Sequence, residues 1–148
     1  MGFGFWSSVF ERIDMQQTNF ENLKIYQLSE KLADRVWDIV VEWNHLAQDT
    51  VGKQIVRAAD SIGANIAEGS GRGSDKDYSR FLKISRGSLY ETKHWLRRAY
   101  KRKLLTQEQT NELKIVMNEL TPKLNAYIRS IGTFRMETEI DKDQKPKP

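Results

Sequence analysis

The sequence contains no cysteine, only two histidines and no long apolar run. The absence of cysteine excludes a disulfide framework, a thiolate metal site and a cysteine nucleophile. Two histidines are too few for a histidine-rich metal site, so we expect neither a metal nor a cofactor. No segment approaches the roughly 18 apolar residues of a membrane span, and the first residues lack the basic region of a secretory signal. We therefore expect a cytoplasmic protein.

Positive charge is concentrated in one part of the chain. The 148 residues carry a net charge of only +4. Residues 72–103, however, contain eleven Lys and Arg residues and three acidic residues, a local charge of +8 that leaves −4 for the rest of the chain. This asymmetry points to an anionic partner more strongly than the total charge does.

Apolar residues recur at steps of three and four along four segments, which is the periodicity of amphipathic helices. The predicted helices span about 21–43, 51–68, 75–103 and 106–132. Their predicted buried lines are Ile25, Leu28, Leu32, Val36, Ile39 and Trp43; Val51, Ile55, Ala58, Ile62 and Ile66; Tyr78, Phe81, Leu82, Ser85, Leu89, Leu96 and Ala99; and Leu113, Val116, Leu120, Leu124, Tyr127 and Ile131. Short joints and the absence of strand alternation predict an all-α, antiparallel up-down-up-down four-helix bundle.

Capping and breaking residues mark the expected helix ends. Asp49 or Thr50 is expected to cap the second helix, Ser74 the third, and Thr106 the fourth, with Gln109 completing a capping box. The glycines at 69, 71 and 73 should end the second helix, one of them in the left-handed conformation. Pro122 should kink the fourth helix, and Gly132 should end it.

The composition divides the chain into three parts. We assign residues 1–19 to an N-terminal aromatic extension, 20–132 to the four-helix bundle and 133–148 to a disordered charged tail. The extension is too apolar for a free tail. It either docks on the bundle or a neighbouring subunit, or serves as a docking handle for another protein. Met1 and Met15 are both candidate starts.

The third predicted helix is the candidate functional surface. Opposite its core face lies a basic line, for which we predict nucleic-acid binding: Lys76, Arg80, Lys83, Tyr90, His94, Arg97 and Lys101, flanked by Arg86 and Arg98. Lysine and arginine neutralise phosphates, and the two aromatic rings could stack on unpaired bases. The alternative is a solvated charged face whose cations pair with acids elsewhere. On a third side, Ile84 and Trp95 contact either a neighbouring helix of the same chain or another subunit.

The corner between the second and third helices carries the residues Asn65, Glu68, Gly69, Arg72 and Ser74, which we interpret as a structural motif. Glu68 is expected to pair with Arg72 or Arg80, and Asn65 to satisfy a backbone group. No Ser/His/Asp pattern and no di-iron motif is present, and His94 with Glu91 is the only histidine–carboxylate pair on adjacent turns of one predicted helix. We therefore expect a protein that is not an enzyme.

Several motifs resemble the four-helix bundle proteins encoded by intervening sequences of 23S ribosomal RNA genes. The resemblance covers about residues 20–131, through Phe20-x-x-Leu23-Lys24-Ile25-Tyr26-Gln27, the run from Gln54 to Ile62, Asn65-Ile66-Ala67-Glu68-Gly69, Gly71-Arg72, Ser74, Tyr78-x-Arg80-Phe81-Leu82 and Gly87-Ser88-Leu89-x-Glu91. Gly63 stands where many relatives have proline, and Tyr26 where tryptophan is common.

This resemblance implies a ring-like homo-oligomer, a pentamer in many relatives, with RNA or DNA as a possible partner. A related branch of the family assists the reverse transcriptase of diversity-generating retroelements and binds nucleic acid on a basic surface. We therefore expect a non-enzymatic, oligomeric bundle that binds RNA or DNA. The alternative is a protein-interaction scaffold or accessory subunit without nucleic-acid contact. A protein partner could bind through the aromatic extension.

Overall fold

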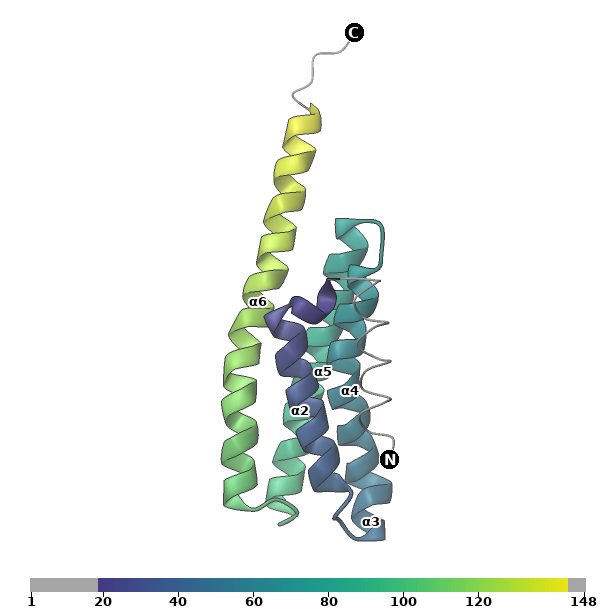
Figure 1. Cartoon of the computed structure of the whole chain (residues 1–148), viewed down its shortest axis with the longest axis vertical. Coiled ribbons are helices and arrows are strands. Elements are labelled where there is room, and N and C mark those ends of the chain that lie inside the picture. The colour runs from purple at the N-terminus through teal and green to yellow at the C-terminus, as the bar shows by residue number, and fades with distance from the viewer. Residues whose placement is uncertain (1–18, 144–148) are drawn as a thin grey trace, which may run out of the picture.

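The computed structural model describes residues 19–143, and the side chains of residues 19–133. This part of the chain is entirely helical, with four long helices and no strand (Figure 1). The elements are η1 (Phe20–Asn22), α2 (Lys24–Val40), α3 (His45–Ala47), the π-helical turn η2 (Gln48–Gly52), α4 (Lys53–Ser70), α5 (Asp75–Lys101) and α6 (Gln107–Asp143). Almost all of the predicted N-terminal extension, and residues 144–148 of the predicted tail, lie outside the described residues.

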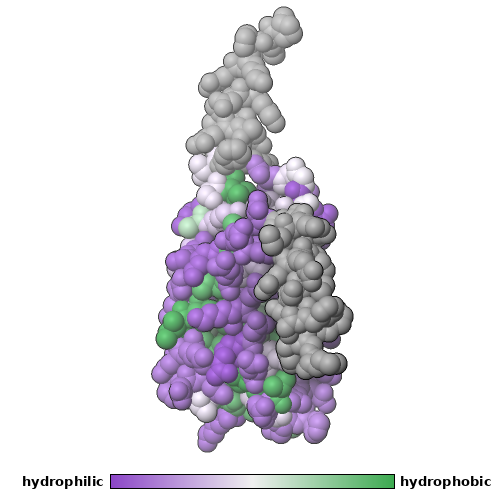
Figure 2. Space-filling model, viewed as in Figure 1, coloured by the Kyte–Doolittle hydropathy of each residue, from purple (hydrophilic) through white to green (hydrophobic). Residues whose placement is uncertain are grey.

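One apolar core lies between the four long helices. Each packs against two others, because α4 contacts α2 and α5 while α6 contacts α5 and α2. The predicted lines are confirmed, with only Trp43, Tyr78, Tyr127 and Ile131 less than fully buried. The surface face in Figure 2 is mainly hydrophilic, with small, separate hydrophobic patches. The four helices thus hide their apolar faces from water, which is the main stabilising contribution of the fold.

Small hydroxyl side chains satisfy the polar groups of the interior. The buried Ser85 donates its Oγ hydrogen to the Ile62 carbonyl on α4, at 2.8 Å. Ser88 and Ser61 join the same two helices through their hydroxyls, 2.9 Å apart. Among the described residues no buried side-chain nitrogen or oxygen lacks a partner. These bonds fix the rotation of α5 against α4, because a buried hydroxyl without a partner would cost free energy.

The predicted caps of the last two helices are confirmed. The Ser74 hydroxyl accepts the Asp77 backbone N–H at 3.2 Å. At the start of α6, Thr106 and Gln109 exchange reciprocal hydrogen bonds of 3.0 Å, which is a complete capping box. The cap expected at Asp49 or Thr50 is wrong. Helical structure begins earlier, where the Asn44 side chain accepts the Ala47 N–H at 3.0 Å.

The glycine corner differs from the expectation in its backbone. Helix α4 does end there, at Ser70, but Gly71 keeps a right-handed φ of −84° and none of the corner glycines has a positive φ. The expectation of a left-handed glycine is therefore wrong. What the corner requires at Gly69 is space, because a Cβ there would lie 2.7 Å from the Phe81 Cβ and 3.0 Å from a Tyr78 ring carbon.

The predicted end of the fourth helix at Gly132 is also wrong, since α6 continues to Asp143. The predicted disordered tail is accordingly helical over 133–143. A glycine costs a helix only about 1 kcal/mol relative to alanine, and the next ten residues contain several good helix formers and no proline. The helix also passes through Pro122 without ending. That proline removes a bond to the carbonyl of Asn118, which is exposed and can be solvated.

In the part of the chain that the structure describes, no helix is both long enough and apolar enough to cross a membrane.

The space at Gly69 predicts a large effect of one methyl group. Gly69→Ala should lower the free energy of unfolding by about 1–3 kcal/mol, because the added Cβ overlaps Phe81 and Tyr78. Chemical denaturation measures the change. Gly73→Ala is the matched control and should be close to neutral, since nothing lies within 4 Å of its added Cβ. Equal stability of both variants would contradict a close contact at this corner.

Candidate nucleic-acid interface

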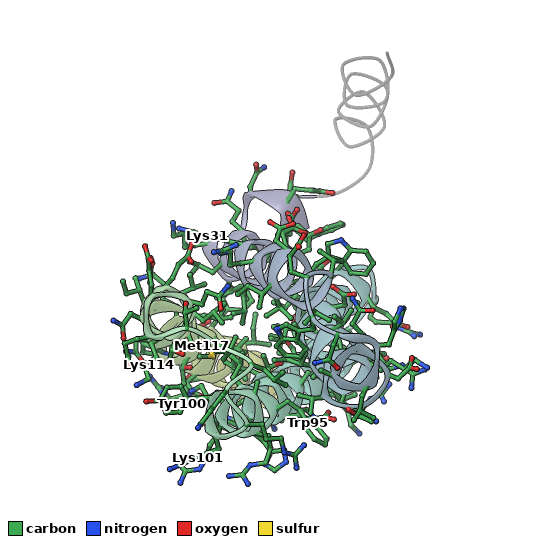
Figure 3. The ribbon with its side chains drawn as sticks, turned by 90° about the horizontal axis from the view of Figure 1, so that it is seen from below. Lys31, Trp95, Tyr100, Lys101, Lys114 and Met117 are labelled. Carbon is green, nitrogen blue, oxygen red and sulfur yellow. The ribbon has the colours of Figure 1, made fainter. Side chains whose placement is uncertain are left out.

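The outer face of α5 presents the predicted basic line to solvent. Seven of its members are exposed, and Arg86 and Arg98 are partly buried at its flanks; the exposed residues are Lys76, Arg80, Lys83, Tyr90, His94, Arg97 and Lys101. One helix brings these side chains together, because its opposite face packs into the apolar core. In the end-on view, Lys101 projects away from the bundle on the side opposite Lys31 (Figure 3). Nucleic-acid binding by these residues stays a prediction.

Most cations of this face lack an anionic partner within the described residues. Arg80 lies 3.8 Å from Asp77 and stacks 4.7 Å above the Phe81 ring. No ion pair joins Lys76, Lys83, Arg86, Arg97, Arg98 or Lys101 to a described carboxylate. Elsewhere, basic side chains do find carboxylates, as Arg35 does with Glu112 at 2.9 Å. The face therefore carries largely uncompensated positive charge, against the alternative of a paired surface.

Two aromatic rings lie within the basic face. Tyr90 is half exposed, and the Lys93 ammonium lies 5.3 Å from its ring centroid. His94 is exposed and meets the Trp95 ring edge-on, with centroids 4.8 Å apart. Glu91 accepts the Trp95 indole N–H at 3.3 Å. His94 and Glu91, the histidine and carboxylate noted in the sequence, thus both contact Trp95.

Gly87 was not predicted as part of this surface. It is exposed between Lys83 and Tyr90, and a Cβ at this position would meet nothing within 4 Å. The fold therefore does not need a glycine here, although the residue costs the helix about 1 kcal/mol relative to alanine. Its effect is to leave the backbone open to close approach from outside. The signal was present in the sequence, as a glycine at an outward position of the helix.

Lys103 adds a positive charge shortly after the end of α5, and its backbone conformation is unfavourable for a residue other than glycine. It is the one non-glycine residue with a positive φ (62°) in the described chain. The Leu104 N–H bonds the Ala99 carbonyl at 2.9 Å and the Lys103 N–H bonds Tyr100 at 3.1 Å, which together form a Schellman motif at the end of α5. Glycine is the favoured residue at this position, so the lysine keeps a charge there at the expense of stability.

The α4–α5 corner contains the ion pair expected for Glu68. Glu68 pairs with Arg72 at 2.7 Å, as expected, whereas Arg80 pairs with Asp77. Both Glu68 and Arg72 are about half exposed, so this pair contributes little to stability. Asn65 donates to the Ser61 carbonyl at 2.8 Å, one turn earlier in α4 rather than at the bend itself.

The third side of α5 is packed within the chain at one residue and exposed to solvent at another. Trp95 is partly buried and packs against the core, while Ile84 remains 43% exposed. Ser88, on the same side, bonds α4. The intramolecular alternative therefore accounts for Trp95, and the subunit interface remains open for Ile84.

A small acidic groove lies elsewhere on the bundle, between α2 and α4. Its volume is about 170 Å³, and it is lined in part by Glu30, Asp34 and Asp60. Desolvation raises the pKa of the Asp60 carboxyl above its ordinary value of 3.8, and the charge of Asp34 raises it further. The groove and the basic face therefore lie on different helices.

Within the described residues, no cluster of three or more His, Asp or Glu side chains is arranged to hold a metal ion. The strongest pKa shift belongs to Tyr78, whose pKa is raised by burial and by its 2.8 Å hydrogen bond to Tyr127. This pair joins α5 to α6 inside the fold, with the rings in edge-to-face contact. It is a packing contact and stands apart from the outer face.

Fold and surface together define an all-α protein of four long helices with one strongly basic helix face. The family model of the 23S rRNA-intervening sequence protein matches residues 21–126. The chain belongs to this family. A comparison with curated proteins finds no match. A crystal structure of a protein with unknown function from the S23 ribosomal protein family of Bacteroides thetaiotaomicron is similar, with a TM-score of 0.63 and 27% sequence identity over 71% of this chain and 95% of that chain.

The left-handed backbone of Lys103 predicts that a glycine at this position would make the fold more stable. Lys103→Gly should raise the free energy of unfolding by about 1 kcal/mol, because glycine adopts the left-handed conformation without steric cost. Arg102→Gly removes the same charge from the neighbouring residue, whose φ is −91°. It should leave stability unchanged or lower. Stabilisation by both variants would assign the effect to charge rather than to the backbone.

The raised pKa of Asp60 predicts how the stability of the fold changes with pH. A raised pKa means that the native state holds this proton more tightly than the unfolded state, so ionisation of Asp60 weakens the fold as pH rises. Asp60→Asn should raise the melting temperature slightly at pH 7, within the roughly 0.5 kcal/mol typical of surface changes. The gain should vanish below pH 3.8. An identical pH profile of Asp38→Asn, a variant outside the groove, would contradict the groove as the source of the effect.

Proposed function

We propose that this protein is a non-enzymatic nucleic-acid-binding protein that contacts the phosphate backbone of RNA or DNA with the outer face of α5. One observation carries the proposal. Basic side chains of this face, among them Lys83, Arg97 and Lys101, are exposed and have no anionic partner among the described residues. Phosphate contacts of this kind release counterions and favour binding without sequence specificity.

Two further features support an RNA or DNA ligand over a small anion. Tyr90 and His94 provide aromatic faces for unpaired bases beside the cations. Gly87 leaves the helix backbone open in the middle of the face, where a sugar–phosphate chain could approach closely.

A protein-interaction scaffold or accessory subunit is the second candidate function. Large apolar side chains are exposed away from α5, with Leu46 at 74%, Ile115 at 69% and Trp37 at 56%. Exposed apolar groups of this size favour association with another protein. The two functions separate by salt, because phosphate contacts weaken steeply with ionic strength and apolar docking does not.

The proposal includes the assembly and location expected from the sequence. We propose an up-down-up-down order of the four helices, a ring-like homo-oligomer, and a cytoplasmic location. The short joints 71–74 and 102–106 support the order, since each connects two helices that pack together. The exposed Ile84 is the candidate contact between subunits. A pentamer is the state that the family resemblance favours.

Removal of two unpaired cations tests the proposed function. Lys83→Ala/Arg97→Ala should weaken binding of a labelled RNA by about tenfold or more and lower the slope of log affinity against log salt by about 1–2. Fluorescence anisotropy across a salt series measures both. The control Lys31→Ala/Lys53→Ala removes two exposed charges from α2 and α4.

The control variant should bind RNA nearly as the unmodified protein does. Absence of RNA and DNA binding by the unmodified protein at low salt would overturn the proposed function. Equal losses in both double variants would show that total charge, and not the α5 face, determines binding.

A further inference from the structure

A cavity lies beside the basic face, between the C-terminal half of α5 and the first half of α6. Its volume is about 490 Å³, within the range of small-ligand sites. Its deeper wall is apolar and consists of Leu96, Leu105, Leu113 and Met117. In the end-on view, Met117 lies inside the bundle while Tyr100 and Lys114 lie nearer its surface, from α5 and α6 respectively (Figure 3).

Cations surround this cavity from both helices. Lys93, Arg97 and Lys101 follow one another at intervals of four residues on α5, and Lys114 faces them from α6. None of the described residues that line the cavity is acidic. Like charges four residues apart repel and weaken a helix, so this arrangement favours an anion at the rim. The Lys93 ammonium is already fixed by a 2.7 Å hydrogen bond to the Thr121 hydroxyl.

Neutral polar groups complete the lining. The exposed Tyr100 ring borders the cavity, and its hydroxyl donates to Gln107 at 3.4 Å. The Asn118 amide makes no hydrogen bond to another described side chain or backbone group, and so offers both a donor and an acceptor. An alkyl chain would leave such groups unused. A nucleobase would use them, because it combines flat apolar faces with a hydrogen-bonding edge.

We propose that this cavity binds one unstacked nucleotide, with the base against the apolar wall and Tyr100 and the phosphate at the cationic rim. The proposal rests on the proposed function, because Arg97 and Lys101 belong to both the cavity and the basic face of α5. A single strand lying on that face could insert a base here, whereas a duplex keeps its bases stacked and paired. The protein should therefore prefer single strands to duplexes.

The test fills the cavity without changing its charge. The probes are a short single-stranded RNA with one central 2-aminopurine, the matching duplex, and adenosine monophosphate. In the unmodified protein, binding of the single strand should raise 2-aminopurine fluorescence, because the base leaves its stack. Met117→Trp should abolish this rise and weaken single-strand binding by about tenfold, the scale of one stacking contact, while duplex affinity stays within about twofold.

Asn118→Ala is the second variant, since it changes an exposed residue and leaves the core intact. It should reduce the fluorescence rise; Asn111→Ala, on an exposed amide outside the cavity lining, should not. Competition by adenosine monophosphate that Met117→Trp removes would identify a free nucleotide as a ligand. Binding of the strand alone would restrict the site to nucleotides within a chain.

Unchanged fluorescence on binding, or equal effects of Met117→Trp on single strand and duplex, would overturn the cavity proposal while RNA binding by the α5 face stands. Loss of all RNA binding in the unmodified protein would instead overturn the proposed function itself.

Discussion

The contact between α4 and α5 at Gly69 is the constraint on which the rest of the structure depends. A side chain at this residue would overlap Phe81, so the two helices can meet at this distance only if the position is glycine. The hydroxyls of Ser85 and Ser88 then bond α4 one and two turns further along α5. With its inner face fixed in this way, α5 can place its many cations only on the outside. The packing of one helix pair thereby produces the charged surface.

The helices and their core were predictable because period and burial are local properties of the sequence. Leu32, Ile62 and Leu120 follow from the spacing of apolar residues alone. The helix boundaries that were predicted wrongly depend on competition between small contributions to the free energy of the helix. Asn44 caps an additional turn that leads through η2 into α4, and Gly132 costs too little to end a helix flanked by good helix formers. The left-handed residue is Lys103 rather than a glycine of the corner, because the Schellman motif forms where α5 ends.

The candidate site was predictable in part. The basic line needs only helical geometry, whereas the cavity combines residues from two helices, such as Arg97 and Lys114, and so required the packed structure. The same holds for two departures from the family pattern. Gly63 and Tyr26 lie in contact, because a Cβ on the glycine would be 3.4 Å from the tyrosine ring. The two residues therefore meet at the α2–α4 interface, away from the basic face.

The central claim is that nucleic acid contacts the outer face of α5, and site-resolved crosslinking tests it most directly. A photoreactive phenylalanine analogue would replace Tyr90 on this face in one protein and the exposed Trp37 on α2 in another. After irradiation with labelled RNA, the account predicts efficient covalent adducts from position 90, suppressed by high salt, and few from position 37. Adducts from position 37 alone, or equal yields from both, would contradict a role of the α5 face in binding.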